Sequence, residues 1–342
     1  MRRTSSSNFS DRLRDMSYRP WGLLDWTLSI TAARQWFFIG ALGTEDRSLA
    51  AWKWVKELGL EKGRAMIQVN PIDATRFCAP TRTALNSRRE EFVACGGSDI
   101  DIEALGLLAE KHEIEALAQK LSEKSPSVIL DISSLPKRFF FLLLRAFRQS
   151  TGIRDLVVTY ACPKEYQSED KLSEGAENWD YLPGFLGTEK SEVLIAAVGF
   201  MVESLQDHLS GSTAHPAVQL LIPFPAPPSA VRRSWESVFK LQSGRNSDKF
   251  VRHRVDANDM SAAFDRICSL GRDVDAVAFA PFGPKPISAA MCLYADQCDS
   301  AVHYPQPHGY HPNYSSGVAI INGKRFVNAY WIKHGGENLY TV

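Results

Sequence analysis

One seven-residue motif occurs twice in the chain, with starting points 144 positions apart. Tyr160–Tyr166 and Tyr304–Tyr310 both read Tyr-x-x-Pro-x-x-Tyr, and each follows directly on an apolar run. Short apolar runs that end in turn residues are typical of strands buried on both faces. A motif at the same place in two halves indicates an internal repeat, and a repeat would determine the fold of both halves together.

Three further landmarks recur in the same order as the tyrosine motifs. The offsets between the copies are 156, 152, 148 and 144, a steady decrease that small loop deletions would produce. A single match is weak, because glycine and proline often end strands. The four pairs are Gly43 and Gly199, Pro71 and Pro223, Pro136-Lys137 and Pro284-Lys285, and the two tyrosine motifs. In this order they predict a true duplication.

Strand-like and helix-like segments alternate in each half. Apolar runs cover residues 35–43, 65–71, 127–132 and 155–160 in the first half, and residues 192–199, 217–225, 250–258 and 276–281 in the second. Helical periodicity covers residues 45–59, 102–123 and 138–150, then residues 200–211 and 260–271. Such alternation is typical of parallel sheets covered by helices. The predicted fold class is α/β, with two tandem Rossmann-like lobes related by internal duplication as a pseudo-dimer.

The length of 342 residues suits two domains of roughly 150 residues. We expect an N-terminal arm at residues 1–33, a first lobe at 34–167, a linker at 168–191 and a second lobe at 192–314. The remainder, residues 315–342, reads as a C-terminal hairpin and tail. Asn322-Gly323 is the expected turn of that hairpin, since this dipeptide favours tight hairpin turns.

Composition excludes few functions. Lysine plus arginine and aspartate plus glutamate both number 39, so there is no global basic signal for nucleic acid, although a local patch leaves that partner open. Six scattered cysteines without Cys-x-x-Cys spacing suggest reduced thiols and a cytoplasmic protein. No apolar stretch reaches the length of about 18 residues that a membrane span needs, so no membrane partner is expected.

Ligands of open parallel sheets bind beyond the carboxyl ends of the strands. The candidate ligand-binding residues all lie there: Gly43, Thr44, Arg47, Ser133, Ser134, Lys137, Tyr160, Gly199, Gly283, Lys285, Tyr304 and Tyr310. Ser133–Lys137 enters a helix, where hydroxyls, free N–H groups and a lysine favour phosphate. The alternative is an ordinary helix cap with a solvated lysine. The tyrosines could stack on a base or ribose, or could pack the sheet edge.

Candidate catalytic residues are Glu45, Asp131 and His308, with no role assigned to any of them. No G-x-G-x-x-G, P-loop or G-x-S-x-G motif is present, so no cofactor is predicted. His303 and His311 lie near His308, but acidic or thiol partners at ligand spacing are missing nearby, so no metal is predicted.

The stretch Asp131–Lys137, Asp-Ile-Ser-Ser-Leu-Pro-Lys, resembles the Asp-Ile/Leu-Thr-Gly-Gly-Thr-Lys loop of CARF domains. These are Rossmann-like sensors of cyclic oligonucleotides in prokaryotic antiviral defence. The resemblance implies a ligand bound across the two-fold axis of the paired lobes. It would place Asp131, Ser133, Ser134, Lys137, Gly283 and Lys285 against that ligand. The chain departs from the pattern where Ser134-Leu135 replaces the paired glycines and where Ala280 lies opposite Asp131.

Three functions remain open. The leading hypothesis is a ligand-sensing module that binds a nucleotide-like, phosphate-bearing molecule between its lobes and signals to a protein effector. The first alternative is an enzyme that uses the same cleft on a phosphodiester or N-glycosidic bond. The second alternative is a non-catalytic assembly subunit of a larger complex.

Overall fold

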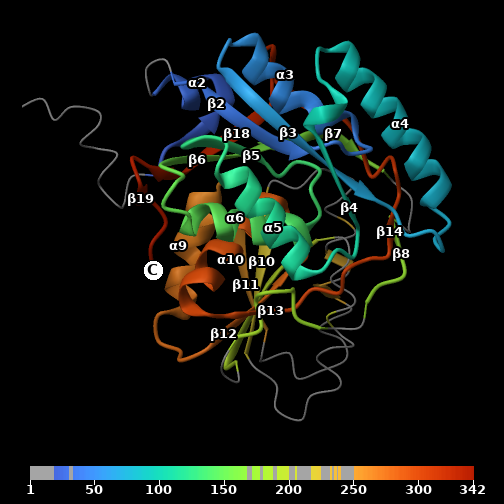
Figure 1. The fold of residues 1–342 in the computed structure, drawn as a ribbon. Coiled ribbons are helices and arrows are strands. Elements are labelled where there is room, and N and C mark those ends of the chain that lie inside the picture. The colour runs from blue at the N-terminus through green and yellow to red at the C-terminus, as the bar shows by residue number, and fades with distance from the viewer. Residues whose placement is uncertain are drawn as a thin grey trace, which may run out of the picture.

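The protein is known from a computed structural model. It describes residues 19–30, 34–167, 172–177, 180–187, 191–199, 217–224 and 250–342, with single positions at 205, 232, 235–236 and 238–239. Two sheets dominate the fold, one of eight strands and one of five. Figure 1 shows the larger sheet above the smaller one, with helices between them.

The core of the large sheet is parallel. Its central strands are buried apolar runs, as expected for a sheet covered on both faces. The spatial order is β4-β3-β2-β5-β6. The bounds are β2 Trp36–Ala41, β3 Glu61–Asn70, β4 Ile102–Gly106, β5 Ser127–Asp131 and β6 Asp155–Ala161. The strand that comes first in the chain is thus central, with the second and third on one side and the fourth and fifth on the other.

The small sheet has the same strand order. Its spatial order is β11-β10-β9-β12-β13, and every pairing in it is parallel. The bounds are β9 Val193–Ala197, β10 Ala217–Phe224, β11 Phe250–Asp256, β12 Val277–Pro281 and β13 Ala301–Val302. The α/β class and the parallel sheets are therefore as predicted. A common origin of the two lobes by duplication stays a prediction.

Helices cover and separate the sheets. Their bounds are α2 Leu24–Ser29, η1 Asp46–Leu49, α3 Ala50–Glu57, α4 Cys78–Ala94, η2 Asp99–Asp101, α5 Lys111–Ser122, α6 Lys137–Gln149, α9 Met260–Gly271 and α10 Lys285–Cys298. Helices α6 and α10 pack against each other between the sheets (Figure 1). Within the described residues, no helix combines the length and apolar character that a membrane span requires.

Two ion pairs to one buried carboxylate join these two helices, because Asp296 of α10 contacts both Arg145 and Arg148 of α6. Arg148 Nη1 lies 2.8 Å from Asp296 Oδ2, and the Asp296 side chain is only 1% exposed. Arg148 follows the first residue of α6 by 11 positions, and Asp296 follows the first residue of α10 by the same number. The two partners therefore occupy the same place on two helices that follow equivalent strands.

One predicted helix is wrong in its first part. Residues 102–123 contain the strand β4 and then the helix α5, which begins only after a capping box between Glu110 and Glu113. The spacing of three between Ile102 and Leu105 suits one face of a helix, and five residues are too few for periodicity to identify a strand. The helix expected at residues 200–211 lies outside the described residues except for Leu205.

The end of the chain returns to the first lobe. β16 Ile320–Ile321 and β17 Lys324–Arg325 pair through Asn322 and Gly323, both at positive φ, so the predicted turn is present. β15 Ser315–Val318 pairs with β7 Pro163–Tyr166, and β14 Gly309–Tyr310 pairs with β8 Ser173–Glu174. β18 Val327–His334 joins β6 in the large sheet, which was not expected. β1 Trp21–Leu23 and β19 Glu337–Asn338 pair with β18.

Candidate functional site: a cavity between the two sheets

A cavity of about 510 Å³ lies where the carboxyl ends of both sheets meet. This volume is within the range of roughly 300–1,000 Å³ that is usual for small-molecule sites. Every parallel strand of the two cores contributes its C-terminal end or the residues just beyond. In chain order these lining residues include Gly43, Asn70, Leu107, Ser134, Cys162, Gly199, Pro223, Ala257, Phe282 and Tyr304.

Glycines allow the loops at the floor of the cavity to touch. A Cβ on Gly43 would lie 2.7 Å from Ser134 Oγ, so the loop after β2 contacts the loop after β5. The second lobe repeats this contact more tightly, because a Cβ on Gly199 would lie 1.9 Å from the carbonyl oxygen of Phe282. Gly283 is also confined, at 2.8 Å from the Cβ of Ala197. A side chain at Gly199 is thus excluded by main chain, whereas at Gly43 the obstacle is the Ser134 side chain.

Arg47 is the most buried charge of the site, at 3% exposure. It lies in the short helix η1 and donates hydrogen bonds to the Glu45 carboxylate at 3.1 Å and to the Ala161 carbonyl at 2.9 Å. It also donates to Ser315 Oγ at 3.0 Å, and its guanidinium lies over the Tyr160 ring at 5.4 Å. Arg47 therefore ties the loop after β2 to the end of β6 and to β15.

Two lysines face the cavity from the first residues of α6 and α10. Lys137 Nζ lies 5.2 Å from the centre of the Tyr304 ring, and no hydrogen bond joins it to another described residue. Burial lowers its pKa to about 8. Lys285 Nζ donates to the Ser133 carbonyl at 2.7 Å. Burial lowers the pKa of Lys285 well below its usual value, and the positive charge of Arg47 lowers it further.

The tyrosine motifs form two matching pairs. The hydroxyls of Tyr160 and Tyr166 are 3.4 Å apart, and those of Tyr304 and Tyr310 are 3.3 Å apart. All four rings line the cavity. Burial raises the pKa of each hydroxyl, so all four are neutral donors or acceptors at physiological pH. The two copies of the motif thus place the same pair of groups at the same cavity.

Most of the predicted binding residues surround this cavity. Those that line it are Gly43, Thr44, Arg47, Ser134, Lys137, Tyr160, Gly199, Gly283, Lys285, Tyr304 and Tyr310. Ser134 Oγ is buried without a hydrogen-bond partner in the described part of the chain. Ser133 lies beneath the surface instead, and it reaches the site only through its carbonyl bond to Lys285.

The three catalytic candidates are separated. Glu45 lines the cavity but is held by Arg47 and Ser315. Asp131 is fully buried behind the wall, where Oδ1 accepts hydrogen bonds from the hydroxyls of Ser133 and Thr159, while Oδ2 has no partner among the described residues. His308 is not among the lining residues and packs against Gly175. Of the three candidates, only Glu45 is therefore placed where it can touch a molecule in the cavity.

Several lining residues were not anticipated from the sequence. They are Val69, Phe77, Leu85, Asn258 and Tyr314, whereas His311, which also lines the cavity, belongs to the histidine-rich segment noted in the sequence. Tyr314 comes four positions after a tyrosine motif, which is the one local signal that could have suggested it. The described residues contain no cluster of three or more histidine, cysteine, aspartate or glutamate side chains that could hold a metal ion.

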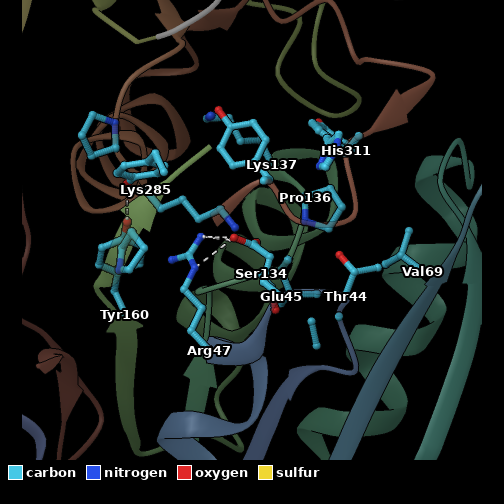
Figure 2. A pocket seen from close by; sticks show the side chains of 18 of the residues that line it. Thr44, Glu45, Arg47, Val69, Ser134, Pro136, Lys137, Tyr160, Lys285 and His311 are labelled. Atoms are coloured by element: carbon cyan, nitrogen blue, oxygen red, sulfur yellow. Dashed lines mark hydrogen bonds and ion pairs between the residues drawn. The ribbon is translucent and has the colours of Figure 1, made fainter. Parts of the chain in front are cut away.

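The charge of the lining is unbalanced. Among the described lining residues one arginine and two lysines, Arg47, Lys137 and Lys285, stand against the single carboxylate of Glu45. Figure 2 shows Arg47 and Lys285 close together on one flank of the cavity, beside Tyr160. Cations crowded in a desolvated site favour a bound anion, which supplies the missing opposite charge. The free Ser134 hydroxyl and the first turns of α6 and α10 add hydrogen-bond donors of the kind that hold phosphate oxygens.

No protein-family model matches the chain, and no curated protein matches it in sequence. Solved structures with a similar course of the chain include a Type III CRISPR defence DNA nuclease activated by cyclic oligoadenylate. The likeness has 10% identity and a TM-score of 0.47, and it covers 80% of this chain and 65% of that one. The chain thus spans just under two thirds of that structure.

Two other structures are less similar. A putative universal stress protein from Pseudomonas aeruginosa UCBPP-PA14 has 12% identity and a TM-score of 0.24, with 81% of this chain and 94% of that chain covered. The cytoplasmic domain of a prokaryotic cation chloride cotransporter has 8% identity and a TM-score of 0.23, with 82% and 98% covered. At these identities and TM-scores, none of the three likenesses supports a conclusion about activity, ligand or partner.

Proposed function

We propose that the protein is a sensor that binds a nucleotide-like, phosphate-bearing ligand between its two lobes and signals to a protein effector. The setting we propose is a prokaryotic antiviral defence system. That setting depends on the resemblance of Asp131–Lys137 to the loop of CARF domains. The proposal for the ligand depends on the cavity itself.

One observation supports the ligand most directly. The carboxyl ends of both parallel sheets meet at one cavity, and Arg47, Lys137 and Lys285 line it against a single carboxylate. Parallel sheets bind ligands at this edge. A phosphate at about 4 Å from one of these cations would gain roughly 4 kcal/mol at an effective dielectric of 20, before the cost of desolvation. Lys137, which makes no hydrogen bond to the described residues, is the cation most available to it.

We also infer that the two lobes arose by duplication and act as a pseudo-dimer. The shared strand order supports this, as do the two lysines that begin α6 and α10 and the two hydroxyl pairs. Equivalent groups from both lobes then face the same ligand. In symmetric dimers a ligand on the axis meets each group twice, so Lys137 and Lys285 would hold equivalent places, with Lys137 the more available because Lys285 is bound to the Ser133 carbonyl.

Calorimetry with a panel of cyclic and linear nucleotides tests the proposal. We expect at least one nucleotide to bind with micromolar or lower Kd, and Lys137→Ala combined with Lys285→Ala to abolish binding. Lys124→Ala, at an exposed lysine beyond α5, is the matched control and should leave Kd unchanged. A panel in which nothing binds, or a double variant that binds as the wild type does, would reject the proposal.

The enzyme alternative has one candidate group at the cavity. Glu45 lines it, whereas Asp131 is buried behind the wall. Incubation of the protein with each nucleotide that binds, followed by separation of products, distinguishes the two functions. Binding without turnover favours the sensor. Turnover that disappears in Glu45→Gln, with binding retained, favours the enzyme.

A further inference from the structure

The cavity has a second region, which is apolar and lies away from the cations. It is formed by the ends of β2, β3 and β4 and by the start of α4. We call it the apolar recess, and its walls are Leu42, Ile67, Val69, Phe77, Leu85 and Leu107. All of these side chains are buried except Val69, which is partly exposed. Figure 2 shows Val69 on the flank opposite to Arg47 and Lys285.

Helix α4 forms one side of the recess and makes only a narrow contact with the first lobe. Only Cys78, Leu85 and Phe92 of this 17-residue helix are buried, so α4 rests on the first lobe along a narrow line. At its start, the Phe77 ring meets His311 edge-on at 5.3 Å between centroids. His311 follows β14 and belongs to the second half of the chain. Residues from both halves of the chain therefore meet at the start of α4.

The chemistry of the recess differs from that of the charged flank. Its walls carry no charge, and the polar residues that line the cavity from the same elements, Thr44, Asn70, Thr75 and Thr81, are uncharged. An apolar surface of this kind gains about 25 cal/mol for each Å² that a ligand removes from water. A bare anion on the charged flank would leave this surface unused.

We infer that the recess binds one planar, apolar substituent of the anion whose charge Arg47, Lys137 and Lys285 neutralise. The inference rests on the proposed function and deepens it. The ligand lies across the cavity in one direction, with phosphate at the start of α6 and α10 and its ring between β3 and α4. For a nucleotide, a base occupies this recess of the first lobe. Val69, Leu85 and Phe77 are then specificity-determining residues.

Two phosphate monoesters test the charged flank and the apolar recess separately. Phenyl phosphate and methyl phosphate carry the same anion, and only the first carries a ring. With wild-type protein we expect calorimetry to give a Kd for phenyl phosphate at least about tenfold lower than for methyl phosphate. Tenfold is the change that about 1.4 kcal/mol produces, which the burial of some 55 Å² of ring supplies.

Val69→Phe fills the recess from β3. It should weaken the binding of phenyl phosphate and so bring the ratio of the two Kd values to within twofold of one. Val251→Phe, at a valine that is 46% exposed on β11, is the matched control and should keep the wild-type ratio. Thr81→Phe fills the recess from α4 and replaces Val69→Phe if that variant does not fold.

The outcomes separate this inference from the proposed function. Equal binding of the two phosphates by the wild type, with loss of both in the Lys137→Ala, Lys285→Ala double variant, overturns the recess and leaves the anion site intact. A tenfold ratio that persists in Val69→Phe and in Thr81→Phe also overturns the recess. No binding of either phosphate counts against the anion site itself.

Discussion

The buried carboxyl group of Asp131 should make the stability of the protein depend on pH. Burial raises the pKa of Asp131 from 3.8 to about 6, against the opposing effect of its hydrogen bonds with Ser133 and Thr159. The folded protein therefore holds a proton that the unfolded chain releases near pH 4. The stabilisation is complete below pH 4 and is lost as the pH rises through 6. A shift of about two pH units at 1.36 kcal/mol each amounts to about 3 kcal/mol.

Asp131→Asn removes this titration and keeps an oxygen for the two hydroxyls. Between pH 4 and pH 7.5, the free energy of unfolding of the variant should therefore rise by about 3 kcal/mol relative to that of the wild type. Urea denaturation at a series of pH values, followed by tryptophan fluorescence, measures the difference. Glu123→Gln, at an exposed position after α5, is the control and should follow the wild-type curve.

The result that refutes this reasoning is specific. If the difference in unfolding free energy between Asp131→Asn and the wild type stays constant with pH, Asp131 does not titrate in this range. If the variant instead loses stability relative to the wild type as the pH rises, the hydrogen bonds of Asp131 lower its pKa by more than burial raises it. Either result would also require a different electrostatic account of Lys285, which faces the same loop.

Three shorter predictions concern the loops, the anion site and the contact between lobes. Gly199→Ala forces a Cβ onto a main-chain oxygen and should lower the free energy of unfolding by more than about 2 kcal/mol, whereas Gly43→Ala meets only a serine side chain and should cost less; equal costs in urea denaturation would contradict this. The affinity of the wild type for phenyl phosphate should fall as the pH rises past about 8, because Lys137 then loses its proton. The affinity of Lys137→Arg should persist, because arginine keeps its charge. If calorimetry at pH 7 and pH 9.5 shows the same loss of affinity in both proteins, Lys137 plays no part. Asp296→Asn should cost about 3 kcal/mol of stability, because it removes the carboxylate that Arg145 and the largely buried Arg148 share. A loss below about 1 kcal/mol in the same denaturation experiment would show that these ion pairs are dispensable.

The order of elements could be predicted because each landmark has a local cause. A strand that ends at Gly43 or Pro71 leaves a mark in the sequence, since glycine permits close approach and proline ends the ladder. β4 could not be recognised, because a half-exposed edge strand has too few buried positions to show a period of two. The return of β18 to β6 is a pairing across more than 160 residues, and no local pattern encodes it.

The part of the candidate site that lies at strand ends could be predicted, because the sequence indicates where the strands end. The lining residues after β2, β5 and β12 follow from the position of each strand, and the two lysines follow from the repeat. Asp131 and Ser133 fell outside the cavity because successive side chains alternate in direction along an extended chain. Both point inward, and Ser134 between β5 and α6 points to the cavity. The apolar recess was missed because its walls are ordinary core residues of three strands and one helix.

The contact between Arg148 and Asp296 has a consequence for assembly. Two copies of the first lobe that met through α6 would bring two guanidinium groups together, and two copies of the second lobe would bring two carboxylates together. Like charges shielded from water repel strongly, so both homotypic pairings are disfavoured and each lobe accepts only the other kind. Within one chain Asp296 instead meets Arg145, Arg148 and Gln149 of α6, so this contact favours the pairing of α6 with α10 over either homotypic pairing.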